Sequence, residues 1–298
     1  MNTIAIKPLR LRLEEIAKKH KLRLGVIEQD YVLSWLLVGI FNHPKLRSFL
    51  VFKGGTALKK MYFGEYRFSE DLDFSIYPEV LIGDSLLDYL SEACAYAEKQ
   101  AREYAPLRMF IERYEEKRPH PSGQEAFTIR TQFPWHREPL TVVMVEVSRD
   151  EVLLYSPISR QLLHGYGEPI VQSARVYALE EIVLEKLRAI LQHTKKLHER
   201  DWGRSRARDY YDLWCIFNEF QKDLMLEALV SMLHKKCESK DVSFSSVESF
   251  FEPVMVNNVI RTWHQWLGPL VQDLPECDRV LEDLKQKISL LLHVDVSV

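Results

Sequence analysis

A Gly-Gly-Thr turn and an Asp-x-Asp motif shortly after it restrict the fold of this chain more than any other feature. A short apolar strand is expected over residues 50–53, and it enters the turn made by Gly54, Gly55 and Thr56. Glycines let a backbone approach a ligand closely, and the Thr56 hydroxyl is expected to cap a helix over residues 57–62. The sequence therefore predicts a strand–turn–helix unit whose helix N-terminus attracts an anion such as phosphate.

The aspartate motif lies in a second strand, expected over residues 70–77, in which polar and apolar residues alternate. Side chains two positions apart on a strand share a face, so Asp71 and Asp73 point the same way while Leu72 and Phe74 face a core. Two carboxylates this near to each other repel unless a cation lies between them. Mg²⁺ suits such a pair because it takes oxygen ligands and bridges to substrate phosphates. We therefore expect a magnesium site at Asp71 and Asp73.

A simpler interpretation is a surface turn followed by a strand with two solvated aspartates. An Asp-x-Asp pair on its own favours that interpretation, because aspartates are mostly exposed. The glycine turn upstream, with Arg67 and Ser69 between the two motifs, favours a binding site instead. We therefore expect phosphate-binding contacts from the turn and from Lys53, Arg67 and Ser69, in a protein that moves a phosphate-bearing group.

The length and composition are those of a globular protein with one large domain or two ordinary ones. The chain has 298 residues, of which 46% are hydrophobic and 28% charged, and its net charge of −3 excludes a globally basic nucleic-acid binder. Its four cysteines are widely spaced, which indicates neither zinc nor a disulfide framework and fits a reducing cytoplasm. The longest apolar run, residues 32–41, is too short to span a bilayer, and no signal peptide is evident. A cytoplasmic protein that does not enter a membrane is expected.

Hydrophobic periodicity predicts an N-terminal α/β part, residues 1–175, and a C-terminal helical part, residues 176–298. In the first part, helices are expected over 9–42 and 86–104, strands over 50–53, 70–77, 108–116, 126–133 and 140–148, and turns at 118–123 and 134–139. From about residue 177 the pattern is helical as far as about residue 293.

Glu146 lies near the end of the strand expected over 140–148 and shares a face with Val142 and Met144. A carboxylate at this position could be a third metal ligand or the base that deprotonates an attacking hydroxyl. It could equally be a strand-end glutamate in solvent, and the residues alone leave these alternatives open.

Lys186 falls on the apolar stripe of a helix expected over residues 178–191, by i+3 and i+4 spacing. A lysine on a buried face is costly unless it is paired, so Lys186 could pair with a triphosphate or with an acidic site. The alternative is a lysine whose stem crosses the edge of the core and whose ammonium reaches water. Glu185 and Arg188 lie off the stripe and are expected on the solvated surface.

Asp209 and Asp212 lie three positions apart on one face of a helix expected over residues 208–217, in line with Leu213 and Ile216. Acids that continue into an apolar stripe indicate a partly buried polar site, to which we expect one of the two to belong. Asp209 could instead be an N-terminal acid that complements the helix dipole.

Two basic runs could contact phosphate groups of a nucleotide or an RNA. Residues 7–23 hold seven Lys or Arg against two acids, and residues 194–208 hold six against two. Trp202 could stack on a base. Charge runs are more often solvated faces, so these runs do not by themselves predict RNA binding. Four histidines without ligand spacing are expected at the surface: His120, His136, His193 and His198.

Taken together, four segments resemble the AbiEii/AbiGii-type nucleotidyltransferase toxins, a family within the DNA polymerase β-like superfamily. The likeness extends from about residue 25 to 220 in the family's order, and it rests on the combination of segments 52–56, 67–74, 185–189 and 208–213. The resemblance implies a mixed sheet flanked by helices, followed by a helical C-terminal domain. It also implies the toxin of a two-component toxin–antitoxin or phage-defence system, with a cognate antitoxin as partner.

The resemblance further implies a nucleoside triphosphate substrate, Mg²⁺, and in some relatives the acceptor end of tRNA. By that resemblance Gly55 and Thr56 hold triphosphate, Asp71 and Asp73 bind Mg²⁺, Lys186 contacts phosphate, and Asp209 or Asp212 completes the site. The chain departs from the family in having Thr56 where serine is common. It also departs in having Glu146 where the third carboxylate is usually an aspartate.

Two alternatives stand beside the toxin interpretation. One is a nucleotidyltransferase that modifies small molecules, as antibiotic-modifying enzymes do. The other is a catalytically silent nucleotide-binding protein with the same fold, against which the intact pair of Asp71 and Asp73 argues.

Overall fold

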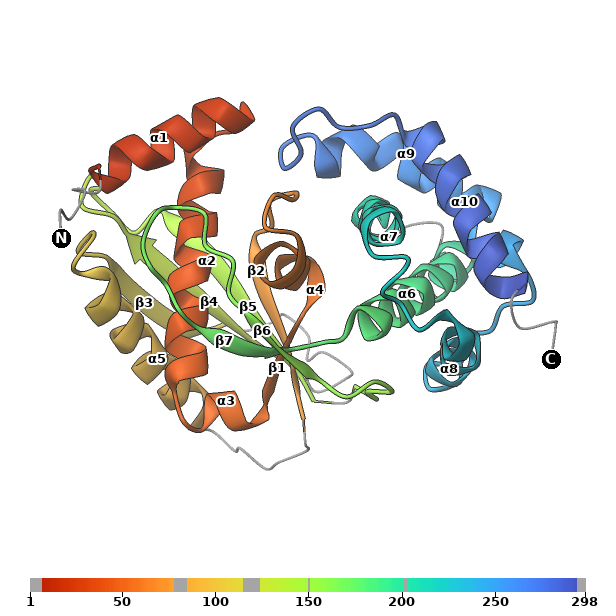
Figure 1. Ribbon diagram of the computed structural model, residues 1–298, viewed down its shortest axis with the longest axis horizontal. Helices are drawn as coiled ribbons and strands as arrows, with labels where there is room; N and C mark the ends of the chain where they lie inside the picture. Colours follow the sequence, from red (N-terminus) through yellow and green to blue (C-terminus); the bar gives the residue numbers. More distant parts are fainter. Residues whose placement is uncertain (1–6, 78–84, 115–123, 150, 201–202, 294–298) are drawn as a thin grey trace. The chain divides into compact units, whose positions relative to one another are not determined.

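The computed structural model describes residues 7–77, 85–114, 124–149, 151–200 and 203–293 (Figure 1). The chain divides into two compact units, each with its own internal contacts. The N-terminal unit comprises residues 1–151 and 157–176, and the helical unit comprises residues 152–156 and 177–298. The sequence did not indicate that the short segment 152–156 belongs to the helical unit. The expected turn at 118–123, His120 and Trp202 lie outside the described residues.

The N-terminal unit is built on a seven-stranded mixed sheet with the strand order β3-β4-β5-β2-β1-β7-β6. Its strands are β1 (Leu50–Lys53), β2 (Asp71–Ile76), β3 (Arg108–Arg113), β4 (Glu125–Gln132), β5 (Thr141–Ser148), β6 (Ile158–Gln161) and β7 (Ser173–Val176). The β2–β5 and β1–β7 pairs are parallel, and the other pairs are antiparallel. The five expected strands are therefore confirmed, whereas β6 and β7 were not predicted from the sequence.

The sheet is accompanied by the helices α1 (Leu9–His20), α2 (Leu24–Asn42), α3 (Leu46–Phe49), α4 (Gly54–Ala57), η1 (Leu58–Phe63) and α5 (Ser85–Ala101). The η1 segment is a π-helix that continues α4 without a break. Helices α2 and α5 pack side by side (Figure 1). A Cβ added at Gly39 would lie only 2.1 Å from the carbonyl oxygen of Ala93, so glycine permits this close approach.

Among the described helices, α2 alone is long and apolar enough to cross a membrane, and 78% of its apolar window is buried inside the protein. Its apolar residues cover the sheet: the Phe41 ring contacts that of Phe74 on β2, with ring centroids 6.1 Å apart. Helix α2 therefore covers the Phe74 face of the sheet, and Asp71 and Asp73 lie on the opposite face.

The helical unit consists of α6 (Leu179–Arg200), α7 (Ala207–Glu219), α8 (Leu226–Glu238), the 3₁₀ turn η2 (Val247–Phe250), α9 (Pro253–Leu267) and α10 (Cys277–His293). This confirms the helical pattern expected from about residue 177 to 293. Helix α6 packs against α7, α8 and α9, and most of its residues are buried.

A buried ion pair joins the segment 152–156 to the helical unit. Lys236 Nζ lies 2.6 Å from Glu181 Oε1 and also donates to the Val152 carbonyl oxygen at 2.7 Å. Glu181 Oε2 accepts hydrogen bonds from the backbone N–H groups of Leu154 and Tyr155. No local sequence pattern indicated Glu181 or Lys236, because their pairing joins three segments that are distant in the chain.

Candidate functional site

The expected alternation in the aspartate strand is confirmed. Asp71 and Asp73 are half-buried, whereas Leu72 and Phe74 are fully buried. The backbone register places Asp73 opposite Lys53 on β1 and beside Glu146 on β5. Because paired residues on neighbouring strands share a face, Lys53, Asp73 and Glu146 form a row across three strands.

The two glycines of the turn lie directly against charged side chains of this region. Gly54 has a φ of +80°, and a Cβ added there would lie 2.2 Å from Asp73 Oδ2. A Cβ added at Gly55 would lie 2.2 Å from a guanidinium nitrogen of Arg67. Side chains at these positions would displace Asp73 and Arg67, so the glycines let these two charged side chains lie against the turn. The expected close approach of a ligand to the glycines stays a prediction. We call Lys53, Gly54, Arg67, Asp71, Asp73 and Glu146 the carboxylate cluster.

Thr56 does not have the expected capping role. The helix begins at Gly54, with Lys53 at its N-cap, so Thr56 lies inside the helix. Its buried hydroxyl donates to the backbone carbonyl oxygen of Asp71 at 2.5 Å. Thr56 therefore ties the glycine turn to the start of β2, which a sequence-local capping rule could not reveal.

The basic side chains of the carboxylate cluster are largely buried. Lys53 Nζ lies 3.3 Å from Ser148 Oγ and 3.6 Å from Glu151 Oε1. The guanidinium of Arg67 donates to the Phe68 carbonyl oxygen at 3.3 Å. Ser69, which was also expected to contribute to the binding site, follows Phe68 in the chain and is buried. The structure thus adds Ser148 and Glu151 to the predicted set, and neither had a sequence motif that pointed to it.

The donor set of Asp71 and Asp73 fits Mg²⁺. Both carboxylates are half-buried on one sheet face, and the missing side chain of Gly54 leaves room for the Asp73 carboxylate beside the turn. Glu146 accepts a hydrogen bond from Gln124 at 2.5 Å. Within the described part of the chain, no three His, Cys, Asp or Glu side chains form a metal-binding group. Mg²⁺ held by two carboxylates and completed by water and substrate oxygens matches this arrangement.

The helical unit holds a second cluster of charges, which we call the lysine cluster: Lys186, Arg206, Asp209 and Asp212. Lys186 Nζ lies 2.9 Å from Asp209 Oδ1 and 2.7 Å from Asp212 Oδ2. Arg206 donates to Asp209 Oδ2 at 3.1 Å. The expected positions of Lys186 on a buried stripe and of both aspartates on one face of α7 are confirmed, and Lys186 pairs with an acidic site.

The electrostatics of the lysine cluster follow from its burial. The Asp212 side chain has no exposed surface and that of Lys186 is 9% exposed. Burial by itself would raise the pKa of Asp209, but the charges of Lys186 and Arg206 outweigh it and hold the pKa below its ordinary value. Asp209 is therefore ionised at neutral pH and belongs to a charge network rather than acting only on the helix dipole.

Three side chains expected at the surface lie elsewhere. Arg188 is buried and donates to Gln192 at 2.7 Å, and Glu185 lies 3.8 Å from the buried ammonium of Lys236. His193 is also buried, and Gly203 packs against its ring. These expectations were wrong because α6 is covered by three helices, whereas the sequence pattern indicated a single buried stripe.

Burial, together with the charges of Arg206 and Lys196, lowers the pKa of His193 to about 4. Of the other described histidines expected at the surface, His198 is exposed and lies 2.7 Å from Glu252, as expected. His136 is instead half-buried, 3.2 Å from Glu28. His193 is thus a neutral, buried neighbour of the lysine cluster at physiological pH.

A family model described as "Nucleotidyl transferase AbiEii toxin, Type IV TA system" matches residues 35–288. This range contains every residue of the carboxylate cluster and of the lysine cluster. No curated protein matches the chain.

Proposed function

Because the chain belongs to the AbiEii family of nucleotidyl transferase toxins of type IV toxin–antitoxin systems, we propose that it transfers a nucleoside monophosphate to an acceptor hydroxyl. The hydroxyl oxygen bonds to the α-phosphorus of a nucleoside triphosphate, the bond to the bridging oxygen breaks, and pyrophosphate leaves. The single observation that supports this most is the row of Lys53, Asp73 and Glu146 beside the glycine turn.

Each residue of the carboxylate cluster has a role in this proposal. Asp71 and Asp73 would hold Mg²⁺, which would neutralise phosphate charge when bound. The backbone at Gly54 and Gly55, with Thr56 and Ser69 behind it, gives the triphosphate a close approach. Lys53 and Arg67 supply positive charge to the phosphates. Glu146 accepts the proton of the attacking hydroxyl.

We propose a phosphate-contacting role for the helical unit as well. Lys186 donates to phosphate, and Asp209 and Asp212 hold its ammonium in place through the 2.9 and 2.7 Å contacts. A lysine already held by two carboxylates loses little side-chain freedom when it meets a substrate, which favours binding.

The acceptor that we propose is the 3′ end of tRNA, with a nucleoside triphosphate as donor and a cognate antitoxin as the controlling partner, in a system that limits phage growth. The basic runs at 7–23 and 194–208 would contact the RNA backbone. The four cysteines are free thiols, which fits action in a reducing cytoplasm.

The test is incubation of the protein with each α-³²P-labelled nucleoside triphosphate, Mg²⁺ and total tRNA. We expect label on tRNA with the wild type and none with Asp71→Ala/Asp73→Ala. Glu70→Ala, which removes an exposed acid directly before β2, is the matched control and should keep activity.

The other outcomes separate the alternatives. Nucleotide binding without label on tRNA would contradict the tRNA acceptor and direct the search to small-molecule or protein acceptors. Equal behaviour of the double variant and the wild type in every assay would contradict an enzymatic role for the aspartates.

A further inference from the structure

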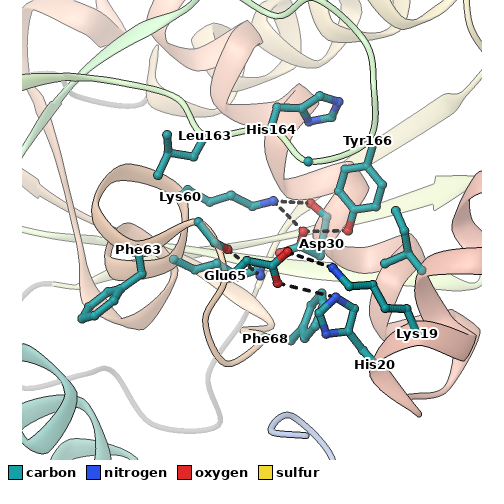
Figure 2. A pocket seen from close by; sticks show the side chains of 14 residues that line it. Lys19, His20, Asp30, Lys60, Phe63, Glu65, Phe68, Leu163, His164 and Tyr166 are labelled. Carbon is teal, nitrogen blue, oxygen red and sulfur yellow. Dashed lines mark hydrogen bonds and ion pairs between the residues drawn. The ribbon is translucent and has the colours of Figure 1, made fainter. Parts of the chain in front are cut away.

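A cavity of about 450 Å³ lies in the N-terminal unit, and none of its lining residues belongs to the carboxylate cluster (Figure 2). Its walls come from the end of α1, from α2, from the π-helix η1 and the turn after it, and from the segment 163–166. Pockets of this volume are typical of small-molecule sites, and π-helical turns occur frequently at functional sites.

The floor of the cavity is a buried, charge-balanced network. Lys60 Nζ donates to Asp30 Oδ2 at 2.6 Å, to the Asp30 carbonyl oxygen at 3.0 Å and to Ser34 Oγ at 2.9 Å. The Tyr166 hydroxyl donates to the same Asp30 oxygen at 2.7 Å. All three ammonium protons of Lys60 are used in these hydrogen bonds, and the charges of Lys60 and Asp30 neutralise each other. The net charge of the cavity therefore depends on the side chains at its mouth.

Among the described residues that line the cavity, Glu65 is the carboxylate at the mouth, and basic side chains lie beside it. Glu65 Oε1 lies 3.1 Å from Lys19 Nζ, and Glu65 Oε2 lies 3.7 Å from His20 Nε2. Figure 2 shows the Glu65 carboxylate pointing toward both side chains. The hydrogen bond from Lys19 lowers the pKa of Glu65, and the charges of His20 and Lys59 add to this effect. The Glu65 side chain is nevertheless 76% exposed, so water reaches it readily.

A short turn holds Glu65 in this position. Gly64 has a φ of +71°, which favours glycine. Lys59 Nζ donates to the carbonyl oxygens of Gly64 at 3.2 Å and Tyr66 at 3.4 Å, on either side of Glu65. The same ammonium lies 4.0 Å from the ring centroid of Phe68, a cation–π contact. The turn therefore presents an exposed carboxylate to Lys19 and His20 above an apolar wall.

We propose that this cavity binds a small molecule that carries a carboxylate or phosphate group, and that the Glu65 carboxylate occupies the position which that group takes. Lys19 and Lys59 provide the positive charge, since Asp30 is already neutralised by Lys60. His20 adds a polar ring contact, because burial lowers its pKa below the ordinary value. Phe63, Phe68 and Leu163 form apolar walls for the body of the ligand. This site is independent of the proposed nucleotidyl transfer.

The test measures binding of inorganic phosphate and of glutarate by calorimetry. Glu65→Gln removes the competing charge at nearly constant shape, so we expect at least one of the two anions to bind about tenfold more tightly than to the wild type, as for loss of a tethered competitor. Glu14→Gln, which removes an exposed carboxylate paired with Arg10 on α1, is the matched control and should change nothing. A larger gain for phosphate indicates a phosphate-bearing ligand, and a larger gain for glutarate indicates a carboxylate.

A second comparison locates the anion. Adding Lys19→Ala to Glu65→Gln should abolish the gain, whereas adding Lys18→Ala, an exposed lysine on the same helix, should preserve it. The gain should also persist with Asp71→Ala/Asp73→Ala. Equal affinities of Glu65→Gln and wild type for both anions would overturn the proposal, as would a gain that Lys19→Ala leaves intact. Unfolding temperatures of all variants verify that each is folded.

Discussion

The carboxylate cluster and the lysine cluster both place aspartates close together, but they differ in how far those carboxylates are buried and paired. In the carboxylate cluster, Asp71 and Asp73 remain half-exposed on a sheet face. In the lysine cluster, Asp212 is completely buried and Lys186 lies 2.7 Å away from it. The first arrangement keeps carboxylates accessible to a ligand, and the second neutralises them within the protein.

Because of this difference, the two clusters should contribute unequally to the free energy of unfolding. A half-exposed carboxylate costs little folding free energy, because water screens its charge. A buried ion pair costs desolvation on both sides, and removal of one partner leaves the other charge uncompensated. Substitutions in the two clusters should therefore affect different measurements.

The largest effect on stability is expected for Asp212→Ala. The substitution leaves the ammonium of Lys186 buried with one carboxylate fewer, which should lower the free energy of unfolding by about 3–5 kcal/mol. Denaturant unfolding monitored by circular dichroism measures this change. Asp278→Ala, an exposed acid in the first turn of α10, should stay within about 0.5 kcal/mol. Similar losses for both variants would show that burial beside Lys186 does not set the cost of losing Asp212.

Asp73→Asn should show the opposite behaviour. Loss of one carboxylate should reduce nucleotidyl transfer about 10²–10³-fold, the usual cost of one charge-stabilising group. The free energy of unfolding should change by less than about 1 kcal/mol, because Asp73 is half-exposed. Labelled-nucleotide transfer and denaturant unfolding of the same preparation provide both numbers. If Asp73→Asn were inactive because it is unfolded, Asp73 would matter for stability as Asp212 does, and the expected difference between the clusters would be contradicted.

Buried His193, beside the lysine cluster, should make the free energy of unfolding depend on pH. Its pKa of about 4 lies below the ordinary value of 6.5, so the unfolded chain binds more protons between these two values. Stability contributed by neutral His193 is therefore complete above pH 6.5 and declines as pH falls toward 4, by about 2–3 kcal/mol. The difference in unfolding free energy between wild type and His193→Gln should follow this curve. A difference independent of pH would show that His193 is not buried in its neutral form.

A smaller effect is expected at the glycine turn. Gly54→Ala places a Cβ against Asp73 at a φ of +80°, which should lower the free energy of unfolding by about 1–3 kcal/mol. Gly25→Ala is the matched control, because nothing lies within 4 Å of its added Cβ and alanine favours the helix α2. Thermal unfolding should thus move in opposite directions for the two variants. An equal response would mean that the close approach to Asp73 does not constrain Gly54.

Local periodicity predicted the parts of both clusters that depend on one element. The alternation around Asp71 and Asp73 identified the exposed face of β2, and the spacing of Lys186, Asp209 and Asp212 identified inward faces of α6 and α7. These features depend only on the periods of strand and helix, so they can be read from one segment without knowing what packs against it.

Other features depended on segments that are distant in the sequence. The Thr56 hydroxyl binds the Asp71 carbonyl oxygen instead of capping a helix, because β2 lies beside the glycine turn. Arg188 and His193 are buried because three helices surround α6. No local pattern could indicate which neighbours would cover those side chains.

The sequence by itself determined the family, the mixed α/β plan and the faces on which the acids and Lys186 lie. Only the tertiary structure decided that Asp73 has Lys53 and Glu146 as its neighbours, since strand register joins β1, β2 and β5. Only the tertiary structure brought Glu65 to Lys19 and His20 at the mouth of a cavity. The physical reason is that backbone geometry sets the direction of each side chain, whereas long-range packing decides what that side chain meets.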